Sequence, residues 1–264
     1  MELATEKMLA RKADGIGWMT FNNPERHNAL GLAMQRAIPQ ILGDFASDPE
    51  VRVVVMTGAG EKAFVSGADI SEFEQQRSSP EAIAEYDRIS AEASRAYGTL
   101  EKPLIAMIRG FCMGGGLLTA MRADLRIASE DAQFGVPAAR LGLGYGFGGV
   151  KALVDLVGPS QTREILLTGK RFPAQDALRW GLVNRVVAGD ELESTVTELA
   201  STIAENAPLT IKAIRKSVDA TLKDESRRDL SEIERLVAEC FASEDYAEGR
   251  RAFMEKRRPE FRGV

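Results

Sequence analysis

The stretch IRGFCMGGGLL at residues 108–118 places three glycines between an apolar run and a second apolar segment. An apolar run at 103–108 precedes the three glycines and predicts a buried strand, and a helix is expected to begin at 115. A helix start presents free backbone N–H groups and a positive dipole end, which favour an anion or a developing oxyanion. Glycines let a ligand approach that backbone closely. A tight strand–helix connection explains the glycines equally well, and the stretch lacks both the dinucleotide-binding spacing and the P-loop lysine.

A second glycine-containing segment stands earlier in the chain, FVSGADI at residues 64–70. It follows a predicted strand at 51–57 and a polar, glycine-containing loop at 58–62. Asp69 and Glu72 are also explained as the acidic first turn of a following helix. The segment alone therefore leaves a binding role and a structural role open.

Composition excludes several classes of protein. The chain has 264 residues, 44% apolar and 28% charged, which is typical of a globular protein with one sizeable core. The net charge of −5 argues against nucleic acid or an anionic membrane surface as a partner. Cys112 and Cys240 match no metal or redox spacing, so we expect free thiols and no metal site. Without an apolar run of about 18 residues or a signal peptide, we expect no membrane span and a cytoplasmic location.

The order of predicted elements indicates an α/β fold with mostly parallel strand pairing. A hairpin around Asp14 and Gly15 comes first, and the nearly continuous β-branched run at 51–57 predicts a strand buried on both faces. Further strands are expected at 103–108, 125–128 and 182–187, with helices at 31–46, 80–100, 115–122, 148–157, 160–168 and 174–180.

The pattern changes after residue 190. Four successive stretches have helical periodicity: 191–206, 208–223, 226–242 and 244–257. We therefore expect an α/β core at 1–190 and a C-terminal helical region at 191–264, packed on something other than its own sheet.

Together, in this order and at this separation, the two glycine segments resemble the signature pair of the crotonase (enoyl-CoA hydratase/isomerase) superfamily. The resemblance extends over nearly the whole chain, through PERHNAL at 24–30, AQFGVP at 132–137, LTGK at 167–170 and WGLV at 180–183. It implies a spiral of ββα units, an acyl-CoA ligand and a thioester enolate intermediate. It also implies homotrimers or dimers of trimers, formed through the C-terminal helices.

The resemblance carries over to individual residues. It makes the backbone N–H groups of Ala68 and Gly115 the pair that polarises the thioester carbonyl. It places the CoA moiety beside Arg26, His27, Ser66, Asp69 and Ile70, and the acyl group beside Leu118 and Ala138. Since CoA is part of the substrate, no separate cofactor is expected. His27 is the only histidine, and contact with the ligand or simple exposure competes with a catalytic role.

Two positions depart from the pattern of a hydratase. Family hydratases have acidic residues where this chain has Leu118 and Ala138, and neither side chain can activate water. Decarboxylation of a malonyl-type thioester needs no base, and Leu117, Leu118 and Ala138 are expected to give its carboxylate an apolar lining. The stretch from Phe134 to Tyr145 also resembles methylmalonyl-CoA decarboxylases, although those enzymes carry a histidine at the position of Ala68 and an acid at that of Leu118.

Three functions therefore stay open. The first is a lyase, with Tyr145 orienting the carboxylate of the acyl group. The second is a hydratase or isomerase that takes its acid from elsewhere in the fold, and the third is a non-catalytic acyl-CoA binder. The competing interpretation of Tyr145 is a packed tyrosine whose hydroxyl is satisfied by backbone.

Overall fold

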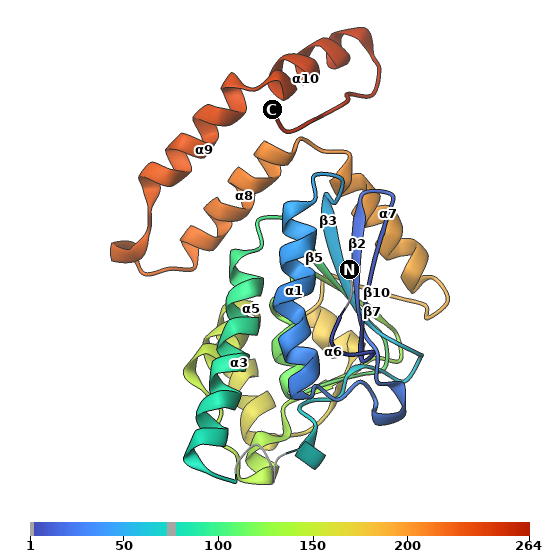
Figure 1. Ribbon diagram of the computed structural model, residues 1–264, viewed down its shortest axis with the longest axis vertical. Helices are drawn as coiled ribbons and strands as arrows, with labels where there is room; N and C mark the ends of the chain where they lie inside the picture. Colours follow the sequence, from blue (N-terminus) through green and yellow to red (C-terminus); the bar gives the residue numbers. More distant parts are fainter. Residues whose placement is uncertain (1–2, 73–77) are drawn as a thin grey trace.

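The fold contains two β-sheets, one of six strands and one of four. The computed structural model (Figure 1) describes residues 3–72 and 78–264, except for the side chain of Ile70. The large sheet has the strand order β1-β2-β3-β5-β7-β10. Only the β1–β2 hairpin in it is antiparallel, as expected from the sequence. Its strands are β1 (Met8–Ala13), β2 (Ile16–Phe21), β3 (Val53–Gly58), β5 (Leu104–Ile108), β7 (Leu125–Ser129) and β10 (Arg185–Val187).

The small sheet, which the sequence did not predict, has the order β4-β6-β8-β9. Its strands are β4 (Ala63–Val65), β6 (Phe111–Met113), β8 (Gln133–Gly135) and β9 (Phe172–Pro173). The successive pairs β3/β4, β5/β6 and β7/β8 each place one strand in each sheet. The chain then continues into α3 (Pro80–Thr99), α4 (Gly115–Ala120) and α5 (Phe147–Thr168) respectively. This repetition confirms the predicted α/β spiral of ββα units.

Helices cover both faces of the large sheet, as the β-branched run in β3 predicts. Side chains alternate between the faces of a strand. Val54 and Met56 belong to the cluster that contains α1 (Leu32–Ser47), whereas Val53 and Val55 pack in the cluster that contains α7 (Leu192–Ala204). All four side chains are fully buried.

One predicted helix break agrees with the structure, and one predicted strand is shorter than expected. Within α5 the backbone breaks at Gly158, whose φ of 75° lies in the left-handed region, so two helical segments result as predicted. The strand expected at 182–187 is shorter, because the N–H of Leu182 donates to the carbonyl of Ala177 and closes α6 (Ala174–Arg179). Pairing with β7 then begins only at Arg185.

The last three helices project from the body (Figure 1): α8 (Pro208–Thr221), α9 (Leu230–Ala242) and α10 (Glu244–Glu255). The predicted helix 226–242 starts late, because the Asp229 carboxylate caps α9 by accepting from the N–H of Glu232. Residues Glu225–Arg227 form a separate 3-10 turn, η4. No helix in the described part of the chain is both long enough and apolar enough to cross a membrane.

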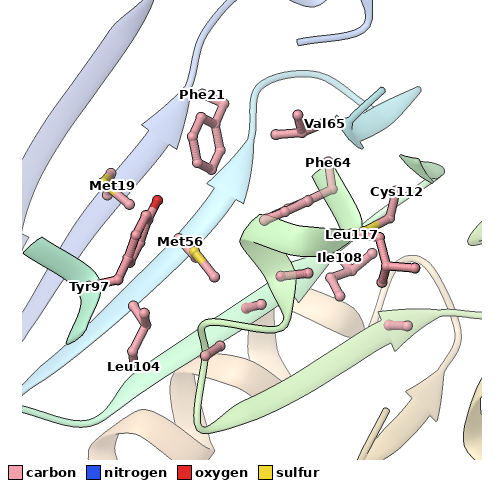
Figure 2. Close-up of a cluster of buried hydrophobic side chains, with 14 of the residues drawn as sticks. Met19, Phe21, Met56, Phe64, Val65, Tyr97, Leu104, Ile108, Cys112 and Leu117 are labelled. Carbon is pink, nitrogen blue, oxygen red and sulfur yellow. The ribbon is translucent and has the colours of Figure 1, made fainter. Parts of the chain in front are cut away.

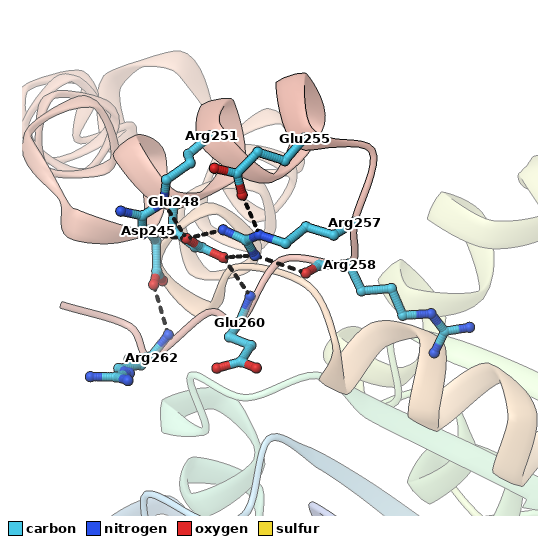
Figure 3. A network of polar contacts seen from close by, with 8 residues as sticks. All are labelled: Asp245, Glu248, Arg251, Glu255, Arg257, Arg258, Glu260 and Arg262. Carbon is cyan, nitrogen blue, oxygen red and sulfur yellow. Dashed lines mark hydrogen bonds and ion pairs between the residues drawn. The ribbon is translucent and has the colours of Figure 1, made fainter.

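A network of charged groups folds the C-terminal tail back onto α10 (Figure 3). The Glu248 carboxylate accepts bonds from the Arg257 and Arg251 guanidinium groups and from the N–H of Glu260. These contacts, that of Arg257 first, hold the pKa of Glu248 well below its usual range. Arg52 donates to the carbonyl oxygen of Phe261 at 2.7 Å, which ties the tail to the body beside β3.

Replacing Lys102 with methionine is expected to lower the free energy of unfolding by about 1–3 kcal/mol. Its ammonium group donates to the carbonyl oxygens of Phe45 and Asp48, each at 2.6 Å, where α1 ends. Methionine keeps much of the apolar stem and leaves both carbonyls without this partner. Urea unfolding would measure the loss, with the exposed Lys223→Met as control, and equal midpoints for the two variants would contradict the assignment.

Candidate active site

The two glycine segments meet at the start of α4. A β-carbon built on Gly115 would lie only 3.6 Å from the backbone nitrogen of Ala68. Among the hydrogen bonds of the described residues, neither of these two N–H groups is a donor. Both residues are partly exposed. The structure thus brings together two unused N–H donors that a ligand can reach.

The orientation of Ala68 is set by its neighbour Leu30. Leu30 N–H donates to the Gly67 carbonyl at 2.8 Å, and Asp69 N–H donates to the Leu30 carbonyl at 3.1 Å. In this parallel bridge the residues on either side of Ala68 make the bonds, so its own N–H points away from Leu30.

The position of α4 depends on a close contact with β4. A β-carbon on Gly116 would lie 2.0 Å from the Val65 carbonyl oxygen, so only glycine permits this approach. The next residue, Leu117, is fully buried and lies in the apolar cluster beside Phe64 and Cys112 (Figure 2). The expectation that Leu117 lines the acyl site is therefore wrong: it anchors the helix in the core.

Leu118 and Tyr145 converge beyond the first turn of α4. A β-carbon on Gly149 would lie 2.8 Å from both the Leu118 Cδ2 and the Tyr145 Cε1. Ala138 is half-buried in the 3-10 helix η3 (Pro137–Leu141), whose first residue approaches Gly114. Among these three described residues of the predicted acyl end, only Tyr145 has a polar side-chain group.

The Tyr145 hydroxyl is buried and has no hydrogen-bond partner among the described residues. The interpretation in which backbone satisfies it is therefore wrong. Burial raises the pKa of Tyr145, so the phenol stays protonated at neutral pH. A neutral buried donor without a partner is suited to a polar group of a ligand.

The two acids nearest to Ala68 in the sequence are already engaged. The Asp69 carboxylate accepts from the backbone N–H and the hydroxyl of Ser71. The Glu72 carboxylate accepts from the N–H of Leu32 at the start of α1. The Asp69 bonds hold the loop at residues 69–71 in place, and the Glu72 bond holds the start of α1.

The residues predicted to contact CoA gather beside Ala68. Ser66 donates from its N–H to the His27 carbonyl and from its hydroxyl to that of Arg26. Arg26 and His27 are exposed, and the His27 ring lies 6.0 Å from that of Phe111. Asp69 is buried, with the Arg26 guanidinium 4.0 Å from its carboxylate. Ile70 begins the 3-10 turn η2 (Ile70–Glu72), and its side chain lies outside the described residues.

Comparison with known proteins identifies the family. The model of the enoyl-CoA hydratase/isomerase family matches residues 11–264. This chain belongs to the enoyl-CoA hydratase/isomerase family. The short-chain-enoyl-CoA hydratase of Clostridium acetobutylicum is 36% identical over 260 residues, which cover 98% of each chain. The carnitinyl-CoA dehydratase of Proteus mirabilis is 36% identical over 240 residues, covering 89% of this chain and 91% of that protein.

Solved structures of the family have the same fold. An enoyl-CoA hydratase from Bacillus anthracis superposes with a TM-score of 0.91 at 30% identity, covering 98% of this chain and all of that one. A protein of the family from Hyphomonas neptunium gives 0.89 at 36% identity, with 97% of each chain covered. Family membership makes this chain an enzyme of the acyl-CoA class and supports an acyl-CoA thioester as its substrate.

Proposed function

We propose that this chain is a lyase that stabilises the enolate of a CoA thioester between the N–H groups of Ala68 and Gly115. The single observation that carries this proposal is the convergence of these two donors, neither of which has a partner in the described chain. Two preorganised N–H groups stabilise negative charge on a carbonyl oxygen as it develops. The CoA moiety would lie along Arg26, His27, Ser66, Asp69 and the backbone of Ile70.

The specific reaction that we propose is decarboxylation of a malonyl-type thioester. The bond between C2 and the carboxylate breaks, CO₂ leaves, and the electron pair forms the enolate held by the two N–H groups. A proton from solvent then completes C2, so no carboxylate base is needed. The apolar side chains of Leu118 and Ala138 suit this route, and the Tyr145 hydroxyl would donate a hydrogen bond that orients the departing carboxylate.

Hydration is the second candidate, because the relatives described above include a short-chain-enoyl-CoA hydratase. Adding water to an enoyl thioester requires groups that remove and deliver protons. Leu118 and Ala138 cannot serve, so a hydratase or isomerase would have to draw an acid from elsewhere in the fold. A non-catalytic binder would hold acyl-CoA and convert no thioester.

A panel of acyl-CoA thioesters separates these functions. The purified protein would be incubated with methylmalonyl-CoA and crotonyl-CoA, and the masses of the thioesters followed. Loss of CO₂ from methylmalonyl-CoA is expected. Gain of water by crotonyl-CoA would favour the hydratase, and binding without any conversion would favour the binder.

The Tyr145→Phe variant is expected to lose roughly tenfold or more in turnover, with CoA affinity unchanged. Phenylalanine keeps the ring beside Leu118 and removes the hydroxyl group. Steady-state kinetics and CoA titration would measure the two effects separately. The matched control is Tyr86→Phe, a tyrosine of α3, and turnover equal to wild type in Tyr145→Phe would end the proposed role of this hydroxyl.

We also propose that copies of this chain assemble as a homotrimer or a dimer of trimers. An apolar groove of about 750 Å³ lies between α8, α9 and α10, and exposed Phe241 and Phe253 contribute to it. Apolar patches of this kind are typical of interaction sites. Sedimentation would show a mass three or six times that of one chain, and a monomer at micromolar concentration would contradict the assembly.

A further inference from the structure

Asn28 is a fully buried amide whose hydrogen bonds tie three loops together. Its Nδ2 donates to the carbonyl oxygens of Ala59 and Ala63, at 3.0 and 2.8 Å. Its Oδ1 accepts from the N–H of Asn23 at 2.9 Å. The side chain is 0% exposed, and both amide protons are used.

The loop at 58–63 is shaped to receive this amide. A β-carbon on Gly58 would lie 2.3 Å from the carbonyl oxygens of Ala63 and Phe64 and 2.6 Å from the Asn28 Nδ2, so glycine allows all three atoms to approach. The backbone of Asn28 has a φ of 56°, a left-handed conformation that asparagine tolerates better than most residues. Asn28 therefore meets both a backbone requirement and a hydrogen-bonding requirement.

The bonds of Asn28 lead directly to the segment that carries Ala68. Ala63 is the first residue of β4, so the amide holds the beginning of that strand. The residues on either side of Asn28 hold the end of the segment: the His27 carbonyl accepts from Ser66 N–H, and Leu30 pairs with Gly67 and Asp69. The stretch from Ala63 to Asp69 is thus fixed at both ends by three residues, His27, Asn28 and Leu30.

We propose that Asn28 is a positioning residue that fixes the N–H of Ala68 at its working distance from Gly115. This inference rests on the proposed role of these two donors. The contact of Gly116 with Val65 sets α4 against β4, and Asn28 holds the beginning of β4 and the residues after it. Without the amide, the Ala63 carbonyl loses its partner and the segment that follows is free to shift relative to α4.

Two substitutions separate the amide from the backbone conformation. Asn28→Gly keeps the left-handed conformation and removes the side chain. Asn28→Asp keeps the shape and the acceptor for Asn23 but has no donor for Ala59 and Ala63. Lys102→Met is the control for a general loss of stability, because the Lys102 ammonium binds carbonyl groups at the end of α1 and contacts neither glycine segment.

The test measures the carbonyl stretch of butyryl-CoA labelled with ¹³C at the thioester carbonyl, by difference infrared spectroscopy on the protein–ligand complex. This saturated thioester can undergo neither hydration nor decarboxylation. In wild type and Lys102→Met, the bound band is expected at lower frequency than in free butyryl-CoA. In both Asn28 variants it is expected to move back toward the free position, and turnover of the best panel substrate to fall roughly 100-fold.

Each outcome bears on the inference separately. A bound band at the wild-type position in both Asn28 variants would overturn it, as would an equal change in Lys102→Met. If the carbonyl band of bound butyryl-CoA is not shifted in wild type, the N–H groups of Ala68 and Gly115 do not polarise the carbonyl, and Asn28 has no such pair to position. A shift that is lost only in the Asn28 variants supports the inference whichever reaction follows enolate formation.

Discussion

Replacing Gly116 with alanine is expected to reduce turnover by roughly 100-fold or more, or to prevent folding. The added methyl group would lie 2.0 Å from the Val65 carbonyl oxygen and 2.8 Å from its carbonyl carbon. Both atoms belong to the backbone of β4, which cannot rotate aside as a side chain can. The start of α4 would have to move away, and the N–H of Gly115 would move with it, away from that of Ala68.

Gly43→Ala is the matched control for this variant. Gly43 is an exposed residue inside α1, and a β-carbon there would meet nothing within 4 Å. Alanine is favoured over glycine inside a helix by about 0.5–1 kcal/mol, so this variant should be slightly more stable and keep full turnover. Thermal unfolding would measure the stability of both variants, and steady-state kinetics would measure their turnover. Wild-type kinetics in a folded Gly116→Ala protein would show that the close contact with β4 is not needed.

Ala68→Pro is expected to lower turnover by roughly 10²- to 10³-fold, because proline has no N–H and so removes one of the two proposed donors. The pairing with Leu30 uses the Gly67 carbonyl and the Asp69 N–H, so it does not depend on the atom that is lost. Much of the local structure should therefore survive, and circular dichroism would verify this.

The control at the same position is Ala68→Ser, which keeps the N–H and adds only a hydroxyl. Its turnover is expected to stay far above that of the proline variant. If a folded Ala68→Pro protein turned over substrate at the wild-type rate, the N–H of Ala68 would have no part in catalysis.

The helices and the strands of the large sheet were predictable from the sequence, and the short strands of the small sheet were not. The strand at 51–57 was recognisable because it is a nearly continuous β-branched run. In the structure its four buried residues, Val53 to Met56, alternate between two helical layers, as that pattern predicts. The strands β4, β6 and β8 have only three residues each, too few to establish a period. They form because the parallel partner strands come from successive turns of the spiral.

The candidate site shows the same division. The proximity of Ala68 and Gly115 followed from the resemblance of two local motifs to a family pair, and the structure places them together. The roles proposed for Gly116 and Asn28 depend on contacts with Val65, Ala59 and Ala63, which lie 31 to 51 positions away in the sequence. An asparagine in PERHNAL indicates a turn, but nothing local indicates which carbonyls its amide will meet.

Formation of a thioester enolate without a carboxylate base is what we propose for this site. It is tested most directly by incubating the protein with methylmalonyl-CoA in D₂O and determining the mass and labelling of the product. We expect propionyl-CoA that carries one deuterium at C2 and gains no second deuterium on prolonged incubation, because Leu118, Ala138 and the protonated Tyr145 cannot remove a proton from the product. Continued exchange at C2 of the product would contradict this proposal. Hydration of crotonyl-CoA without release of CO₂ from methylmalonyl-CoA would contradict it as well.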